Sequence, residues 1–200
     1  MSKQLKVILL CLVFLALILG AVKLYPRLSA GYQPPSAAPA AEDAPAAEAP
    51  AAVQPQRDPA PDFTVQDGAG ESVALMDFVG QPIVLNMWTS WCGPCRQELP
   101  AFDAAYAEYG DEVVFMMVNL TDGASETVEG VTAFVQEEGY SFPVYFDVDL
   151  SAMMAYNVLS IPTSVFIDAE GNIAGTRVGS LSAKDLQAQI ERILDNSASN

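Results

Sequence analysis

The chain has 200 residues and a formal net charge of −16, from 9 Lys and Arg against 25 Asp and Glu. This charge argues against a nucleic-acid partner, because phosphate binding requires clustered basic side chains. The chain has no histidine, which excludes Ser–His and Cys–His catalysis, most catalytic zinc sites and imidazole copper sites.

An unbroken apolar run, Val7 to Val22, opens the chain, with two lysines before it and Lys23 and Arg27 after it. A helix over the run is about 24 Å long, and flanking apolar residues extend it toward the thickness of a bilayer core. We therefore expect a transmembrane anchor over residues 7–24. A cleavable signal peptide is the alternative, but Leu28-Ser29-Ala30 is a poor cleavage site because a small residue should stand where Leu28 stands.

The charges around this run predict how the chain is oriented. The α-amino group and two lysines precede the run, which places residues 1–6 in the cytoplasm and the remainder outside. We therefore predict a single-pass protein of the cell membrane with an extracytoplasmic domain. Residues 25–60 are rich in Ala and Pro and are expected to form an extended linker.

Residues 61–196 are expected to form one folded domain, followed by a tail at 197–200. Apolar patterns and turn residues within it predict an alternation of strands and helices, which indicates an α/β sandwich around a mixed sheet. The expected strands cover 62–65, 72–75, 83–88, 113–120, 143–146, 164–167 and 173–178. The expected helices cover 92–109, 127–138, 150–156 and 182–194, with a kink at Pro100 and an N-cap at Ser182.

The motif Cys92-Gly93-Pro94-Cys95 follows a predicted buried strand and opens a predicted helix. At a helix N-terminus, unpaired N–H groups and the helix dipole stabilise a thiolate, so the pKa of the Cys92 thiol should fall. Cys95 lies one turn further along, within reach of a disulfide. Pro94 suits the first turn, where its missing N–H is not needed. The motif in this strand–helix context predicts thiol–disulfide redox chemistry.

Other uses of this motif fit the sequence poorly. Structural zinc requires four ligands, and the predicted domain has no further Cys or His; haem attachment requires a histidine where Arg96 stands. A structural disulfide across two intervening residues would constrain little of the chain. We expect no metal and no cofactor.

The stretch VLNMWTSWCGPCRQELP, residues 84–100, resembles the thioredoxin superfamily and, more narrowly, the TlpA/ResA-like membrane-tethered thioredoxins. Further matching motifs are Ala60-Pro61-Asp62-Phe63, Ile161-Pro162-Thr163, Asp168-Ala169-Glu170-Gly171 and Val178-Gly179, so the resemblance covers residues 60–194. It implies a thioredoxin-like three-layer sandwich with a central mixed sheet. A helix–strand insertion of the TlpA type is expected within residues 125–146.

The resemblance also implies roles for site residues. Cys92 would attack a substrate disulfide, and Cys95 would resolve the mixed disulfide. Pro162 matches the family's cis-proline, with an ordinary loop proline as the alternative. In the family, the backbone of the residue before it, here Ile161, pairs with an extended substrate segment. Trp91 would pack beside the thiol, and with Gly93 and Pro94 it would complete the substrate-binding surface.

Two polar positions near the motif distinguish this chain from plain thioredoxins. Asn86 stands where those proteins carry a buried Asp, so that route for a proton is lost. Glu98 matches an acid that the ResA-like group uses near its site. A buried carboxyl there could raise the thiol pKa values and take the proton of Cys95, whereas a solvent-facing helix glutamate would do neither.

The resemblance implies an extracytoplasmic protein-disulfide reductase. Apocytochrome c or another protein disulfide would be the substrate, and a membrane donor of the CcdA or DsbD kind would restore the dithiol. A disulfide oxidase or isomerase with the same cysteines is the first alternative, since the compartment is oxidising. A peroxiredoxin and a non-enzymatic tethered binding module are further alternatives. We expect a monomer.

Overall fold

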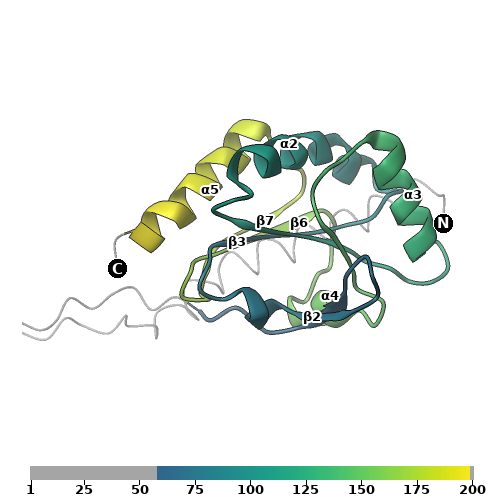
Figure 1. Cartoon of the computed structure of the whole chain (residues 1–200), viewed down its shortest axis with the longest axis horizontal. Helices are drawn as coiled ribbons and strands as arrows, with labels where there is room; N and C mark the ends of the chain where they lie inside the picture. The colour runs from purple at the N-terminus through teal and green to yellow at the C-terminus, as the bar shows by residue number, and fades with distance from the viewer. Residues whose placement is uncertain (1–57, 199–200) are drawn as a thin grey trace, which may run out of the picture. The chain divides into compact units, whose positions relative to one another are not determined.

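A mixed seven-stranded sheet forms the centre of the fold in this computed structural model, which describes residues 58–198 (Figure 1). The strands are β1 (Thr64–Gln66), β2 (Ser72–Ala74), β3 (Ile83–Trp88), β4 (Val114–Asn119), β5 (Val144–Phe146), β6 (Thr163–Ile167) and β7 (Ile173–Val178). The helices are α2 (Gly93–Tyr109), α3 (Val128–Glu138), α4 (Ser151–Ala155) and α5 (Ala183–Ala198), with a 3-10 helix η1 at Leu75–Phe78.

The strand order, β2-β1-β5-β4-β3-β6-β7, places β3 and β4 near the middle of the sheet. β3 pairs in parallel with β4, and β4 with β5, while β6 runs antiparallel to β3. In β3 every residue is buried, as expected of a central strand that is covered on both faces. The expected mixed sheet between helical layers is therefore confirmed.

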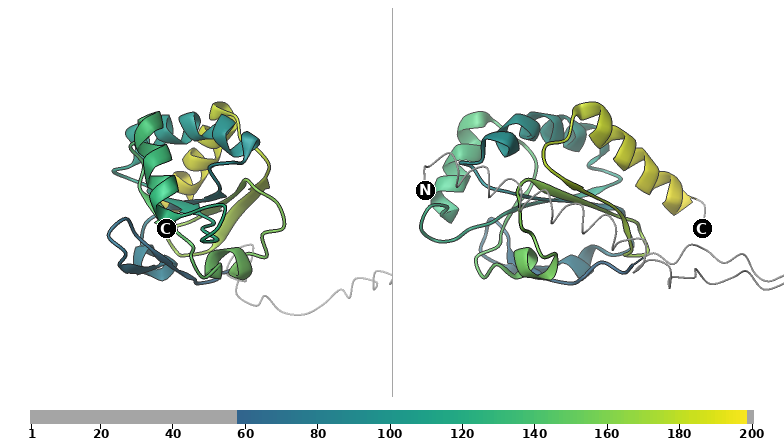
Figure 2. Two further views of the ribbon diagram at one scale, coloured as in Figure 1. Left: turned by 90° about the vertical axis from the view of Figure 1, so that its right-hand side faces the viewer. Right: turned by 180° about the vertical axis from the view of Figure 1, so that it is seen from behind.

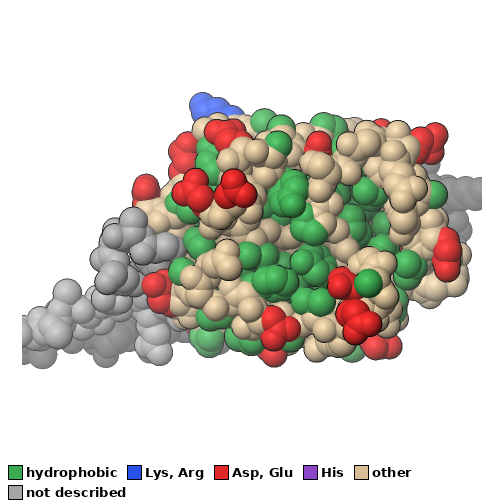
Figure 3. Space-filling model, in the orientation of Figure 1, with side chains coloured by type: hydrophobic (Ala, Val, Ile, Leu, Met, Phe, Trp, Pro, Cys, Tyr) green, Lys and Arg blue, Asp and Glu red, His purple; other side chains and the backbone are tan. Residues whose placement is uncertain are grey.

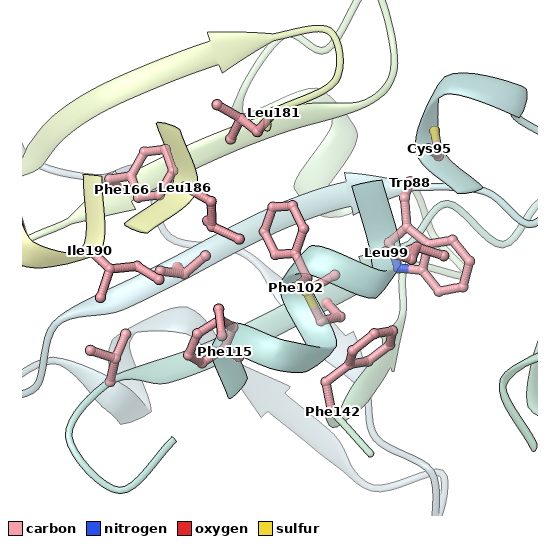
Figure 4. Close-up of a cluster of buried hydrophobic side chains, with 14 of the residues drawn as sticks. Trp88, Cys95, Leu99, Phe102, Phe115, Phe142, Phe166, Leu181, Leu186 and Ile190 are labelled. Atoms are coloured by element: carbon pink, nitrogen blue, oxygen red, sulfur yellow. The ribbon is translucent and has the colours of Figure 1, made fainter. Parts of the chain in front are cut away.

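Two apolar cores lie on the two faces of the sheet, because successive side chains of β3 point to opposite faces. Val84 and Trp88 belong to the core beneath α2 and α5, which also contains Phe102, a buried residue of α2. The side chains of this cluster converge between helix and sheet in Figure 4. Leu85 belongs to the opposite core. Both views in Figure 2 place α2, α3 and α5 on one side of the sheet and α4 on the other.

The element boundaries differ from the predictions mainly at strand ends. β1 begins at Thr64 instead of residue 62, and Leu75 begins η1 instead of ending a strand. Pro100 lies inside α2, which continues to Tyr109. Ser182 does cap α5, since its Oγ accepts from the N–H of Asp185 at 3.2 Å. The predicted insertion is present as α3 and β5.

The last residues of the predicted linker are attached to the domain. Pro59 forms a bridge with Asn172, the N–H of Ile173 donates to the Asp58 carbonyl at 2.8 Å, and Ala60 is buried. At the other end α5 extends to Ala198, beyond the expected boundary at 196. The predicted membrane anchor at 7–24 lies outside the described residues. Within 58–198, the helices are all too short or too polar to cross a bilayer.

Candidate active site

Cys92 and Cys95 form a disulfide at the start of α2, with their Cα atoms 5.2 Å apart. Cys92 is the N-cap residue, and its Sγ accepts from the N–H of Cys95 at 3.2 Å. The Cys92 side chain is 6% exposed, whereas that of Cys95 is fully buried. The sequence produces this placement because β3 ends at Trp88 and a short turn leads into a helix with Pro94 in its first turn. Cys92 is therefore the more exposed residue of the pair.

The segment around Pro162, distant in sequence, lies beside the disulfide. Cys92 Sγ is 3.9 Å from the carbonyl oxygen of Ile161, and the Ile161–Pro162 peptide bond is cis. The turn after β7 contacts the Pro162 segment, since the N–H of Gly179 donates to the Pro162 carbonyl at 2.8 Å. The structure therefore brings the predicted residues Ile161 and Pro162 to Cys92.

Exposed apolar side chains flank these segments. Trp91 precedes Cys92 and is 61% exposed, Leu159 lies two residues before Ile161 and is 88% exposed, and Val178 is 67% exposed. Val178 is the register partner of Thr163, next to Pro162. Gly93 and Pro94 are also exposed. Sequence reasoning identified Trp91, Gly93 and Pro94 but missed Leu159, because nothing in its pattern distinguishes an exposed leucine from a buried one.

Glu98, one turn beyond Cys95, is almost fully buried at 1% exposure. Its Oε1 accepts from Asn86 Nδ2 at 2.8 Å, and its Oε2 accepts from the N–H of Leu181 at 2.8 Å. Burial raises the pKa of the Glu98 carboxyl, and the two hydrogen bonds offset part of that rise in pKa. The solvent-facing alternative for Glu98 is therefore wrong, because the α2 face that carries it packs against the turn before α5.

Asn86, the polar residue in the middle of β3, orients Glu98. Its Nδ2 also donates to Ser164 Oγ on β6 at 3.0 Å. Its Oδ1 is buried and has no hydrogen-bond partner among the described residues. The amide can therefore turn over and accept from this pair instead of donating to it, so the network tolerates either a charged or a neutral group at position 98.

A second buried carboxylate, Glu126, also lies at the site and was not singled out from the sequence. It is 2% exposed and accepts hydrogen bonds from Ser90, two residues before Cys92. The sequence holds little signal for it, because a glutamate just before a predicted helix is usually a solvated first-turn residue. Only the packing of the loop after β4 against the turn before α2 reveals its burial.

This arrangement supplies the parts of dithiol–disulfide exchange. A cysteine at a helix N-terminus is stabilised as a thiolate, and a buried carboxyl stands one turn away from its partner. The buried partner cysteine can attack the first cysteine in a mixed disulfide and so displace the substrate sulfur. Across residues 58–198, no cluster of three or more His, Cys, Asp or Glu side chains is placed to hold a metal ion.

Known proteins resemble this chain in sequence and in fold. The AhpC/TSA family profile matches residues 57–176. The thioredoxin-like protein YneN of Bacillus subtilis is 35% identical over 133 residues, which is 66% of this chain and 76% of YneN. The thiol–disulfide oxidoreductase ResA of Bacillus anthracis is 32% identical over 134 residues, 67% of this chain and 76% of ResA.

Among solved structures, the crystal structure of StoA from Bacillus subtilis has 30% identity and a TM-score of 0.57. The match covers 66% of this chain and 97% of StoA. The family profile, the relatives and the site geometry agree. This chain therefore belongs to the AhpC/TSA family, with its thioredoxin-like fold, and is a thiol–disulfide oxidoreductase of the ResA and StoA type.

Proposed function

We propose that this enzyme reduces protein disulfides, with Cys92 as the attacking cysteine and Cys95 as the resolving cysteine. The observation that carries the roles of the two cysteines is the asymmetry of the pair at the α2 N-terminus. Cys92 retains some exposure and its Sγ lies 3.9 Å from the Ile161 carbonyl oxygen, while Cys95 is fully buried. Only the first sulfur can meet a bulky substrate, and only the second is shielded until a mixed disulfide has formed.

The exchange moves two electrons from the enzyme to the substrate. The Cys92 thiolate attacks one sulfur of the substrate disulfide, that S–S bond breaks, and the released substrate thiolate takes up a proton. Cys95, once deprotonated, then attacks the Cys92 sulfur of the mixed disulfide. The second substrate sulfur leaves as a thiolate, and the enzyme is left with the Cys92–Cys95 disulfide that the structure contains.

Glu98 is proposed to take the proton from Cys95. It lies three residues further along α2, and burial raises the pKa of its carboxyl toward values at which a thiol proton can be exchanged. Replacing it by Gln should raise the pH at which the resolving step occurs and slow exchange at neutral pH. Unchanged cysteine titration together with an unchanged exchange rate would show that Glu98 has no such role.

The surroundings of Cys92 suit an extended protein segment better than a small thiol. The backbone before Pro162 can pair with a substrate strand, which supplies affinity without sequence specificity. The exposed Trp91, Leu159 and Val178 side chains provide apolar contacts on the segments that meet there. More generally, acidic side chains surround apolar ones on the face of the domain drawn in Figure 3, in keeping with the net charge of −16.

The cellular setting is also part of the proposal. We infer an uncleaved anchor at residues 7–24, a linker over 25–60 and a catalytic domain outside the cytoplasm, on the basis of the apolar run and its flanking charges. A thiol–disulfide oxidoreductase in an oxidising compartment needs a reducing supply, and a membrane dithiol donor of the CcdA or DsbD kind would provide it. A cytochrome c maturation substrate, such as apocytochrome c, would fit this setting.

The deciding experiment is the reduction potential of the Cys92–Cys95 pair in residues 57–200, measured by equilibration with glutathione or dithiothreitol buffers. A value near or below about −250 mV, at the thioredoxin end of the range, supports a reductase. A value of about −120 to −180 mV, the range of oxidants and isomerases, would instead make the enzyme a disulfide oxidase or isomerase. The cysteine roles survive either outcome.

A further inference from the structure

Glu126 contacts the turn that carries Cys92. Its Oε1 accepts from the backbone N–H of Ser90 at 2.5 Å, and its Oε2 accepts from the Ser90 hydroxyl at 2.9 Å. A third donor, Asn119 Nδ2, reaches Oε1 at 2.6 Å. All three partners are neutral, and the side chain is 2% exposed. Burying a carboxylate with no cation beside it is costly, so these three bonds are needed to keep it in place.

Residues of the loop that contains Glu126 also help to hold its carboxylate in place. Thr121 Oγ1 donates to Asn119 Oδ1 at 2.8 Å, which leaves the Asn119 amide only its Nδ2 to present to Glu126. Asp122 Oδ1 accepts from the N–H of Glu126 at 2.8 Å and from the N–H of Ala124 at 2.8 Å. The loop between β4 and α3 is therefore shaped to direct one glutamate inward.

Ser90 is the residue through which this loop reaches the redox centre. The N–H of Cys92 donates to the Thr89 carbonyl at 3.4 Å, so residues 89–92 form one closed turn. Glu126 accepts from both the N–H and the hydroxyl of Ser90 and so fixes this turn. The turn sets the direction of the chain from the end of β3 to Cys92. We propose that Glu126 is a positioning residue for thiol–disulfide exchange, acting through Ser90 on the placement of Cys92. The proposal depends on exchange chemistry and not on its reducing direction.

The first test compares Glu126→Gln with Glu129→Gln in the full chain. Both remove one negative charge from the same region, but Glu129 is exposed in the first turn of α3. Gln at 126 can still accept from the two N–H groups, but its NH2 group faces the Ser90 hydroxyl, which must turn round to accept. The bonds to a neutral amide are also weaker than those to a carboxylate, so the turn at Ser90 is held less firmly. We expect Glu126→Gln to lower kcat/KM for insulin disulfides about 10-fold or more, since small misplacements of a reacting group have such effects. Glu129→Gln should stay within about twofold of the unmodified chain.

A double-mutant cycle tests the route through Ser90. Ser90→Ala removes one of the two hydrogen bonds between these residues, so Glu126→Gln should cost less in the Ser90→Ala background than it does alone. Independent, multiplying effects would overturn the proposal, as would a folded Glu126→Gln protein with the activity of Glu129→Gln. If the Glu126→Gln protein does not fold, the melting temperature and kcat/KM of the Ser90→Ala protein test the proposal instead. An unchanged melting temperature together with an unchanged kcat/KM would then refute the role.

A third measurement does not depend on the proposed substrate. The pH profile of Cys92 alkylation by iodoacetamide, followed on the Cys92 peptide by mass spectrometry, reports the thiolate directly. We expect its midpoint to move to higher pH in Glu126→Gln, because a displaced Cys92 loses part of the stabilisation that the N-terminus of α2 gives its thiolate, and to stay in place in Glu129→Gln. An unshifted midpoint in folded Glu126→Gln protein would count against the positioning role, even if insulin proves not to be a substrate.

Discussion

Replacing Glu98 by Gln should change how the stability of the oxidised domain depends on pH. Burial raises the pKa of this carboxyl above its ordinary value of 4.5. A carboxyl with a raised folded-state pKa stabilises the fold when it is protonated. That contribution is therefore complete below the unfolded-state pKa and is lost as the pH rises through the folded-state pKa.

The structure sets the size and sign of the effect. Between the two pKa values, one linked proton lowers the free energy of unfolding by up to about 1.4 kcal/mol per pH unit. Gln at 98 can keep the hydrogen bond from the Leu181 N–H, and the Asn86 amide can turn its unpaired Oδ1 toward the new NH2 group. At acidic pH we therefore expect the two proteins to agree within about 1 kcal/mol. With rising pH the Gln variant should become the more stable one.

Urea unfolding of residues 57–200 in the disulfide state, from about pH 4 to pH 8, measures this difference. The oxidised state removes both cysteines from the titration, and the remaining carboxyls cancel in the comparison. Glu129→Gln serves as the matched control, because Glu129 is exposed and its loss should leave the pH dependence unchanged. Stability curves for wild type and Glu98→Gln that run parallel across this range would refute the argument.

Three other tests, one on the two cysteines and one each on Leu159 and Asp122, have definite expected outcomes. Cys95→Ser should accumulate a mixed disulfide with a protein substrate, detectable on non-reducing gels, whereas Cys92→Ser should not; trapping by Cys92→Ser would reverse the two roles. Leu159→Ser should raise KM for protein disulfides several-fold and leave reaction with a small disulfide unchanged, because Leu159 is 88% exposed; equal effects on both substrates would argue against an apolar docking role. Asp122, whose pKa is lowered to about 2 chiefly by the Ser125 hydroxyl, stabilises the fold above its unfolded-state pKa, and this contribution is lost as the pH falls toward 2. Asp122→Ala should therefore lower the melting temperature at pH 7 but not at pH 2, and an unchanged melting temperature at pH 7 would contradict this.

The sequence by itself determined the chemistry and most of the fold. A buried strand followed by Cys92-Gly93-Pro94-Cys95 predicts a redox pair at a helix N-terminus, because local hydrogen bonding and the helix dipole act within a few residues of Cys92. The mostly apolar sequence of β3 and the periodic pattern of α3 depend only on neighbouring residues, so they too could be predicted. Element ends were less certain, as at β1 and α5, because fraying and capping depend on tertiary contacts.

Only the tertiary structure decided which polar side chains are buried and which apolar ones are exposed. Glu98 is buried because the segment before α5 covers α2, and Glu126 is buried because the loop after β4 folds onto the turn before Cys92. Leu159 is 88% exposed although Val158, the residue before it, is buried. Each outcome depends on residues far apart in the chain, between about 36 and 83 positions for the two glutamates. Burial depends on that long-range packing, so a short sequence pattern cannot predict which of these side chains are buried.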